Sequence, residues 1–326
     1  MDETASLQPY NQKARELIEL ARDYADNADA PNTTRTYESN WNEFRAFCAR
    51  FHATPLPASP ATVVAHIAEL AEAGYKTNTL KTKLAAIRHY HNLERVEDPT
   101  QDPAVKQTLK GIRRKHPAAP ERKAGIEEAD MRLMLAAQPD DIRGARNRAI
   151  LLVGYACALR RSEIVALDRQ SIRFRRDRVI VHIAQSKTDK SGEGYDIHVP
   201  AAADQRMCAV HALKTWLVVS KIADGPLFRK IDQWGHVWEH RLTDQVVADI
   251  VKQSAVAAEI DPTLVSGHSL RRGAITNAAS KQHEAKDIRK LSRHKSEIML
   301  DVYIQESADA QMRVIGDNLG GTRRAQ

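Results

Sequence analysis

The chain has 326 residues, of which 42% are hydrophobic and 28% charged, so it is long enough for about two domains with ordinary buried cores. Its 49 Lys and Arg residues outnumber 42 Asp and Glu residues, which gives a formal net charge of +7. No apolar run approaches the ~18 residues of a membrane span, residues 1–30 lack the apolar segment of a signal peptide, and the cysteines form no CxxC pair. We therefore expect an intracellular, cytoplasmic protein without disulfides.

Residues before position 115 have helical periodicity throughout. Apolar residues recur at steps of four and three, in the order Tyr37, Trp41, Phe44, Cys48, Phe51. Ser59-Pro60 is typical of a helix start, and Gly74 is typical of a helix end. Further apolar stripes at 17–24, 80–91 and 105–112 bring the prediction to about five helices and no strand. Because the aromatic residues keep helical spacing, we interpret them as core rather than as surfaces for stacking bases.

A basic segment covers residues 101–123 and carries +5 of the net +7. It contains seven basic and two acidic residues: Lys106, Lys110, Arg113, Arg114, Lys115, Arg122 and Lys123 against Asp102 and Glu121. The prolines at 117 and 120 interrupt the helical pattern, which predicts an exposed linker at 116–125 between domains at 1–115 and 126–326. A solvated helix face explains such a run. The alternative is a strap that lies along a polyanion such as a nucleic acid.

The second domain has a mixed pattern. Residues 143–158 predict an apolar helix, and RVIVHIAQ at 178–185 and YDIHVP at 195–200 predict strands. A polar turn at 186–194 joins them, with Lys187 at its shoulder. Further helices are predicted at 203–220, 243–258, 269–281 and 284–291. The fold class is therefore mainly α with a small β-sheet: an all-helical N-terminal domain and an α+β second domain.

The segment from His236 to His240 matches the HxxEH pattern of zinc proteases. That pattern requires a helix, so that both imidazoles share one face, and a third ligand downstream. Here the preceding residues 232–235 (DQWG) predict a turn, and no third ligand stands out. We therefore expect no metal site, and we interpret the three cysteines as small core residues.

Three groups of polar residues in the second domain are more informative. Arg160 and Arg161 close the apolar helix, where a solvated face would be expected to be polar. His268 and Arg271 stand at positions i and i+3 of a predicted helix start, which places them on one side. His294 and Tyr303 follow nine residues apart. A salt bridge or a half-buried tyrosine explains each group by itself, but not their combination in this order.

This ordered set resembles the tyrosine recombinase (phage integrase) family, especially its Cre-like members. ALRRSEIVAL is similar to the family's first arginine box, SKTDKSGEG to its lysine hairpin, HSLRRGA to its His-x-x-Arg box, and LSRHKSEIMLDVY to the segment that ends in the nucleophile. The resemblance spans essentially the whole chain, because the N-terminal helices are similar to the family's SAM-like core-binding domain. This sequence differs from the family pattern at Arg293, where many members carry glycine.

The resemblance implies a role for each matching residue. These are Arg160 and Arg271 as phosphate-clamping arginines, Lys187 as the hairpin lysine, His268 and His294 as the histidines, Glu163 as support and Tyr303 as nucleophile. From the chemistry we expect His268 to assist the loss of the tyrosine proton, His294 to hydrogen-bond the phosphate, and Lys187 to act as general acid. Two guanidinium groups suit a phosphate whose negative charge grows during attack, because they bind bidentately and keep their protons. A tyrosine, with an ordinary pKa of about 10, needs help to lose its proton.

The function implied is site-specific recombination through a covalent 3′-phosphotyrosyl intermediate, without metal, ATP or other cofactor. The partner expected is double-stranded DNA with inverted repeats, which makes the protein nucleoid-associated. Seven residues are expected to contact DNA: Lys81, Lys83, Arg88, Lys110, Arg113, Arg114 and Lys115. Two alternatives are a type IB topoisomerase-like relaxing enzyme and a non-catalytic DNA-binding regulator.

Residues after Tyr303 carry a short apolar stripe of Met312, Ile315 and Leu319. One interpretation is a terminal helix that folds back on its own domain. In the family, such a helix docks into the neighbouring protomer, which implies a homotetramer on two synapsed sites.

Overall fold

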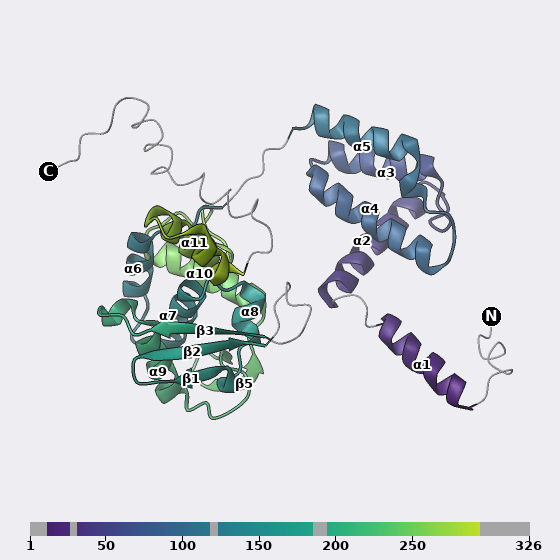
Figure 1. Ribbon diagram of the computed structural model, residues 1–326. Helices are drawn as coiled ribbons and strands as arrows, with labels where there is room; N and C mark the ends of the chain where they lie inside the picture. The colour runs from purple at the N-terminus through teal and green to yellow at the C-terminus, as the bar shows by residue number, and fades with distance from the viewer. Residues whose placement is uncertain (1–11, 27–30, 118–122, 185–193, 294–326) are drawn as a thin grey trace. The chain divides into compact units, whose positions relative to one another are not determined.

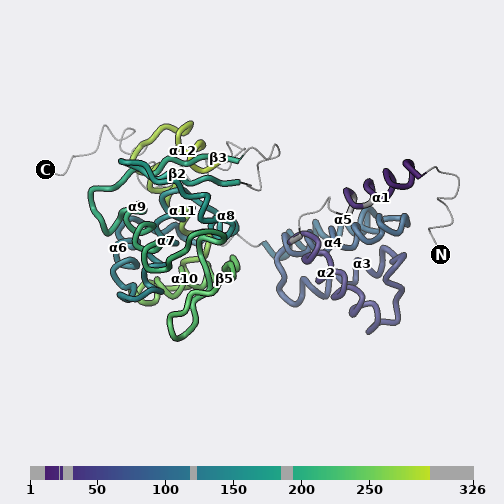
Figure 2. Tube along the Cα trace, turned by 90° about the horizontal axis from the view of Figure 1, so that it is seen from below, coloured from purple at the N-terminus to yellow at the C-terminus, as the bar shows by residue number. Residues whose placement is uncertain are grey.

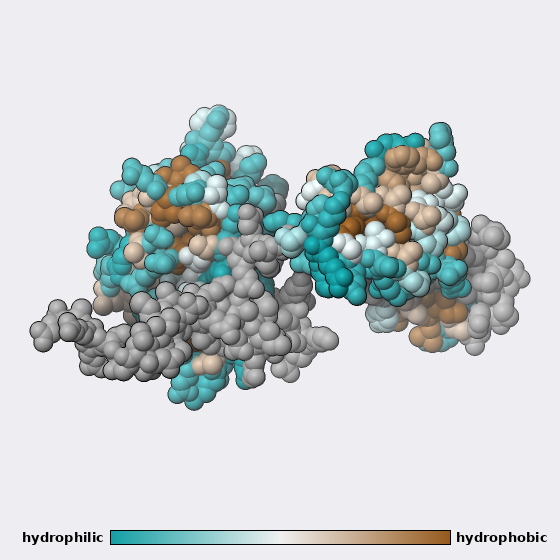
Figure 3. All heavy atoms as spheres, turned by 90° about the horizontal axis from the view of Figure 1, so that it is seen from above, coloured by the Kyte–Doolittle hydropathy of each residue, from teal (hydrophilic) through white to brown (hydrophobic). Residues whose placement is uncertain are grey.

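A computed structural model describes residues 12–26, 31–117, 123–184 and 194–293. The chain divides into two compact units, residues 1–121 and 122–326. No helix in the described ranges is long and apolar enough to cross a membrane. On the faces seen in Figure 3, polar side chains surround confined apolar patches on both units.

The first unit is helical, as predicted. Its described elements are α1 (Gln12–Asp26), α2 (Pro31–Arg50), α3 (Pro60–Glu72), α4 (Thr77–Leu93), a 3₁₀ turn (Pro99–Gln101) and α5 (Pro103–Lys115). Within this unit α2 packs against α4, and α3 packs against α5 (Figure 1). The described part of the unit contains no strand.

The predicted helix signals and core are confirmed in α2 and α3. Ser59 Oγ accepts a hydrogen bond from the Thr62 amide at 3.1 Å, and Gly74 ends the segment with a φ of +87°. Trp41 and Phe44 are buried, and the Trp41 ring stacks on Tyr90 with centroids 4.7 Å apart. The aromatic stripe is therefore core, with one difference. Phe51 follows the end of α2 and is 60% exposed.

The second unit surrounds one apolar helix. Its helices are α6 (Glu128–Ala136), α7 (Ile142–Ala156), α8 (Arg161–Ala166), α9 (Ala209–Ser220), α10 (Asp244–Ala257), α11 (Ser269–Ser280) and α12 (Ala285–Ser292). Short 3₁₀ turns cover Arg169–Ser171 and Gln205–Met207. Helix α7 is buried over most of its length and packs against α8, α9, α10 and α11 (Figure 2). Helix α7 is therefore the centre of packing in the second unit.

Two small antiparallel sheets complete the second unit. The first has the order β1 (Ile172–Phe174), β2 (Arg178–Ile183), β3 (Tyr195–Pro200), with Val179 opposite Val199 and Val181 opposite Ile197. These residues join the core formed by α7 and α9, which confirms the predicted β2 and β3. The second sheet pairs β4 (Arg229–Ile231) with β5 (Val237–Arg241). All three cysteines are buried and free.

The HxxEH segment lies on β5 and the turn before it, rather than on a helix. His236, Trp238 and His240 follow one another with ring centroids 5.1 and 6.3 Å apart. The described residues contain no group of His, Cys, Asp and Glu side chains that could hold a metal ion.

Candidate active site

Arg160 is held at the point where the chain passes from α7 to α8. Ala158 adopts a left-handed φ of 48°, and Arg160 follows in extended conformation as the cap of α8. Glu163 Oε1 accepts a hydrogen bond from the Arg160 guanidinium at 2.6 Å, while Oε2 accepts one from the Arg160 amide at 2.9 Å. Glu163 therefore fixes both the backbone and the side chain of Arg160, whose side chain remains 19% exposed.

The start of α11 brings Arg271 and His268 to the same region. Arg271 is 5% exposed and donates to the Ala158 carbonyl oxygen at 2.6 Å and to the Ser292 carbonyl oxygen. Its guanidinium therefore connects the α7–α8 turn to the end of α12. Gly267, just before α11, lies against the side chain of Arg161, because a Cβ there would be only 1.9 Å from Cδ of Arg161.

His268 lies in a positively charged environment. Burial lowers its pKa most, and the positive charges of Arg161, Arg271 and Arg160 lower it further, against a smaller opposite effect of Asp244. The neutral imidazole is therefore favoured at neutral pH, which is the form that accepts a proton.

Arg293 stands where many members of the family that the sequence resembles carry glycine. Its side chain also lies beside Arg160 and Glu163. Arg293 follows α12 with a φ of 54° and donates to Glu163 Oε2 at 2.7 Å and to the Cys157 carbonyl oxygen at 3.2 Å. Only 8% of its side chain is exposed. A sequence pattern could not have found these contacts, because they depend on the turn that follows α12.

Glu163 is the negative centre of the cluster and is 3% exposed. Burial alone would raise its pKa, but the charge of Arg293 and then the hydrogen bonds and charge of Arg160 outweigh burial, so its pKa is lowered. An ionised carboxylate therefore joins two arginines that come from different parts of the chain.

The structure brings together four of the seven predicted catalytic and supporting residues. These are Arg160, Glu163, His268 and Arg271, which we call the arginine cluster. Hydrogen bonds place Arg160, Glu163 and Arg271 at the α7–α8 turn, and the charges of Arg160 and Arg271 lower the pKa of His268. Lys187, His294 and Tyr303 lie outside the described residues. Strands β2 and β3, which flank the turn predicted around Lys187, are described and paired up to Ile183 and Tyr195.

Most of the residues expected to contact DNA are on the surface of the first unit. Lys110, Arg113, Arg114 and Lys115 are exposed on α5, whose Val105 is buried. Lys81 is exposed on α4, and Arg88 forms an ion pair with Asp98 at 3.1 Å.

Lys83 differs from the others. Its side chain is 5% exposed, pairs with Glu43, donates to Asn40 at 3.4 Å and lies 5.1 Å from the centre of the Tyr75 ring. Helix α4 turns this position toward α2, so in this structure Lys83 serves the packing of the first unit.

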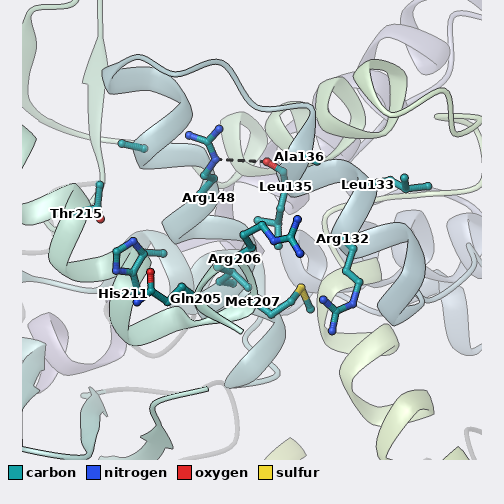
Figure 4. Close-up of a pocket in the computed structure, with 13 residues that line it drawn as sticks. Arg132, Leu133, Leu135, Ala136, Arg148, Gln205, Arg206, Met207, His211 and Thr215 are labelled. Carbon is teal, nitrogen blue, oxygen red and sulfur yellow. Dashed lines mark hydrogen bonds between the residues drawn. The ribbon is translucent and has the colours of Figure 1, made fainter. Parts of the chain in front are cut away.

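A cavity of about 580 Å³ lies apart from the arginine cluster, between α6, α7 and α9 (Figure 4). Leu135 and Met207 line it, and Arg132, Arg148 and Arg206 surround it. Arg148 donates to the Leu135 carbonyl oxygen at 3.3 Å, and Arg132 pairs with Asp204 at 2.5 Å. None of the described candidate catalytic residues lines this cavity, so the arginine cluster is the candidate active site.

Comparisons with known families match both units. The model of the phage integrase family matches residues 125–309, and the model of the phage integrase N-terminal SAM-like domain matches residues 22–95. The chain is 35% identical over 285 residues to an integrase/recombinase XerD homolog of Selenomonas ruminantium, covering 86% of this chain and 83% of that protein. It is 29% identical over 265 residues to tyrosine recombinase XerD of Bradyrhizobium diazoefficiens, covering 76% of this chain and 77% of that protein.

Solved structures share the fold at lower identity. A lambda integrase dimer bound to a COC′ core site has a TM-score of 0.60 at 14% identity, covering 90% of this chain and 94% of that one. A lambda integrase tetramer bound to a Holliday junction has a TM-score of 0.61 at 14% identity, covering 90% of this chain and 77% of that one. These relatives are of Xer and lambda type, so the narrower resemblance to Cre stays a prediction.

Proposed function

We propose that this chain, which belongs to the phage integrase family of tyrosine recombinases, is a site-specific recombinase that uses the cluster around Glu163 to activate a DNA phosphate. The observation that carries the proposal is the meeting of Arg160 and Arg271 at one turn, where Glu163 fixes the first and the Ala158 carbonyl holds the second. Guanidinium groups placed in advance stabilise developing charge on a phosphate without reorganising during the reaction.

The proposed reaction has two transesterification steps. The Tyr303 oxygen attacks the phosphorus, the bond to the 5′ oxygen breaks, and a 3′-phosphotyrosyl link forms. His268, favoured as neutral imidazole, assists the loss of the tyrosine proton, and Lys187 protonates the leaving 5′ oxygen. His294 donates a hydrogen bond to the phosphate. Because the phosphotyrosyl link keeps the energy of the broken bond, a 5′ hydroxyl of a second strand reverses the step without ATP.

The proposed partner is duplex DNA with inverted repeats, which the basic surface of α5 contacts through phosphates. The exposed side chains of Arg113, Arg114 and Lys115 occupy the last turn of that helix. They precede the linker proposed between the domains, so they are suited to follow the DNA backbone rather than to enter a groove. The proposed assembly on two synapsed sites is a homotetramer that forms through the C-terminal segment.

The function is tested by trapping the covalent intermediate. We expect the protein to form an SDS-resistant adduct on a nicked duplex made from the inverted repeats of the DNA flanking its gene. Since arginine, lysine and histidine side chains supply the charge stabilisation, the adduct should form at the same rate in excess EDTA and without nucleotide. Disappearance of the adduct on chelation, with recovery on adding zinc or magnesium, would instead indicate a metal mechanism.

The same substrates separate the proposed function from its alternatives. Recombinant joints formed from two sites support a recombinase, whereas relaxation of supercoiled DNA without joints indicates a topoisomerase. Specific binding without any adduct indicates a non-catalytic regulator.

The proposed binding of α5 to phosphates predicts a change in salt dependence. Replacing Arg113, Arg114 and Lys115 with alanine should weaken binding to all sequences alike. It should also flatten the slope of log K against log salt by about 0.9 for each phosphate that is no longer neutralised, or up to about 2.7 for three. Fluorescence anisotropy on specific and random duplexes over a range of salt concentrations measures both effects.

A charge-conserving control separates phosphate binding from base reading. Arg113→Lys with Arg114→Lys keeps both charges but removes the forked geometry that reads guanine. We expect this variant to keep the wild-type slope and sequence preference. A changed preference at constant slope would contradict the phosphate interpretation.

A further inference from the structure

We infer that Arg293 is a positioning residue for the recombination chemistry: it holds the Glu163 carboxylate, and through it Arg160, in the geometry that receives the DNA phosphate. This inference rests on the proposed function and adds a residue to its machinery. The interactions that carry it join four segments of the second unit: the α7–α8 turn, the start of α8, the start of α11 and the end of α12.

The backbone at Arg293 favours a residue other than arginine. Its φ of 54° and ψ of 35° lie in the left-handed region, where glycine and asparagine are favoured and a side chain such as arginine is strained. Its amide donates to the Arg289 carbonyl oxygen at 2.8 Å, so the turn is a regular end of α12. The strain is compensated by the interactions of the side chain.

The side chain of Arg293 is buried against the candidate active site. One terminal nitrogen donates to Glu163 Oε2 at 2.7 Å and lies 3.4 Å from the Ala158 carbonyl oxygen. The other terminal nitrogen donates to the carbonyl oxygens of Cys157 and Leu291, both at 3.2 Å. The same Ala158 carbonyl accepts from Arg271, so Arg293 touches the supports of both clamping arginines.

The two oxygens of Glu163 have different partners. Oε1 accepts from the guanidinium of Arg160, while Oε2 accepts from Arg293 and from the Arg160 amide. Without Arg293, Oε2 keeps only the amide, and the plane of the carboxylate is no longer fixed by cations on both sides. The carboxylate that accepts from the Arg160 guanidinium is then held only by its bonds to Arg160 itself. A misplacement of about 1 Å in a positioning group is enough to cost about 100-fold in rate.

Arg293 also keeps the Glu163 carboxylate ionised. The charged groups that face it are Arg160 from the start of α8 and Arg293 from the end of α12, with Arg271 of α11 held at the neighbouring Ala158 carbonyl. Burial raises the pKa of Glu163, and the charge of Arg293 is the largest effect that lowers it. Removing that charge raises this pKa, so the carboxylate takes up a proton at a higher pH and releases Arg160.

The test compares four substitutions in the full-length protein. Arg293→Asn removes the charge and keeps a residue suited to the left-handed turn, and Arg293→Gly does so with the least backbone strain. Arg293→Lys keeps the charge without the fork. Lys290→Asn is the matched control, because Lys290 is 73% exposed on the last turn of α12. For each protein, the single-turnover rate of adduct formation on the nicked duplex is measured across a pH series from acid to mildly alkaline, with DNA affinity and thermal midpoint.

We expect Arg293→Asn and Arg293→Gly to form the adduct about 10- to 100-fold more slowly at neutral pH, with DNA affinity within about twofold of wild type. The acid limb of their pH profiles should move to higher pH, because removing the positive charge of Arg293 raises the pKa of the Glu163 carboxyl. Arg293→Lys should recover part of the rate and most of the pH profile. Lys290→Asn should match wild type in every measurement.

A double-mutant cycle with Glu163→Gln separates positioning from direct interaction with the phosphate. If Arg293 acts through Glu163, adding Arg293→Asn to Glu163→Gln slows the adduct by less than about twofold. Full additivity, or a wild-type rate and acid limb in Arg293→Asn and Arg293→Gly, overturns the inference while the proposed function stands. Absence of an adduct with the wild-type protein overturns both. If Arg293→Asn fails to fold, the rates of the glycine and lysine variants decide.

Discussion

Tyr303→Phe is expected to bind its target duplex with wild-type affinity and to form no covalent protein–DNA complex. The substitution removes one oxygen and keeps the ring, so it removes the proposed nucleophile with little change in volume. Tyr303 lies outside the described residues, and the expectation rests on the order of the motifs and on the arginine cluster that Tyr303 would serve. We expect the rate of adduct formation to fall below detection, a larger effect than that of any Arg293 substitution.

The matched control for this experiment is Tyr195→Phe. Tyr195 begins β3 and is 44% exposed, and it is not one of the residues to which a catalytic role is assigned. It should form the adduct at the wild-type rate. Proteolysis of the wild-type adduct should place the DNA on the peptide that contains Tyr303. An adduct that survives in Tyr303→Phe, or one that maps to another tyrosine, would show that the nucleophile has been misassigned.

The helices of the first unit could be predicted from sequence because each carries local signals that tertiary packing did not override. The Ser59-Pro60 start and the Gly74 end of α3 are properties of a few neighbouring residues, and the stripe from Trp41 to Cys48 has the helical period. The alternating residues of β2 and β3 predict their strands for the same reason. In all these cases the signal lies within the element or at its ends.

The elements that sequence patterns did not predict are short or weakly patterned. Helix α8 has six residues, β1 and β4 have three each, and β5 exposes four of its five residues, so none presents a periodic apolar face. Helix α6 is different, because Met131, Met134 and Leu135 are buried at helical spacing. The sequence does carry that signal, so α6 was predictable in principle.

The site could be predicted only where a residue's role is carried by a motif. Arg160, Glu163, His268 and Arg271 were identified by their order along the chain. The hydrogen bonds from Arg271 to Ala158 and from Arg293 to Glu163 join residues 113 and 130 positions apart. The interactions of Arg293 depend on a left-handed turn that no residue type in that segment demands. The burial of Lys83 depends on Glu43 in another helix. Both therefore required the folded chain.

The second large effect is expected from changes to the C-terminal residues, which we propose join the protomers of the recombining assembly. Strand exchange between two duplexes needs several active sites held together, and a cyclic head-to-tail contact closes a small number of subunits into a ring. The 23 residues that follow Tyr303 contain the apolar stripe Met312, Ile315 and Leu319. These residues also lie outside the described part of the chain, so the proposal that they dock into a neighbouring protomer rests on their spacing and on the family resemblance.

Removing residues 307–326 should abolish recombination and cooperative binding to a full site, while leaving binding to a half-site within about twofold of wild type. A second variant, with serine at 312, 315 and 319, should have the same effect without shortening the chain, because it removes only the apolar stripe. Gel-shift titration of half and full sites and a two-site recombination assay measure these effects, with thermal unfolding as the control for folding. If both variants load two protomers cooperatively and recombine, the tail has no part in assembly. If both unfold, the stripe packs against its own domain and the interface between protomers must lie elsewhere.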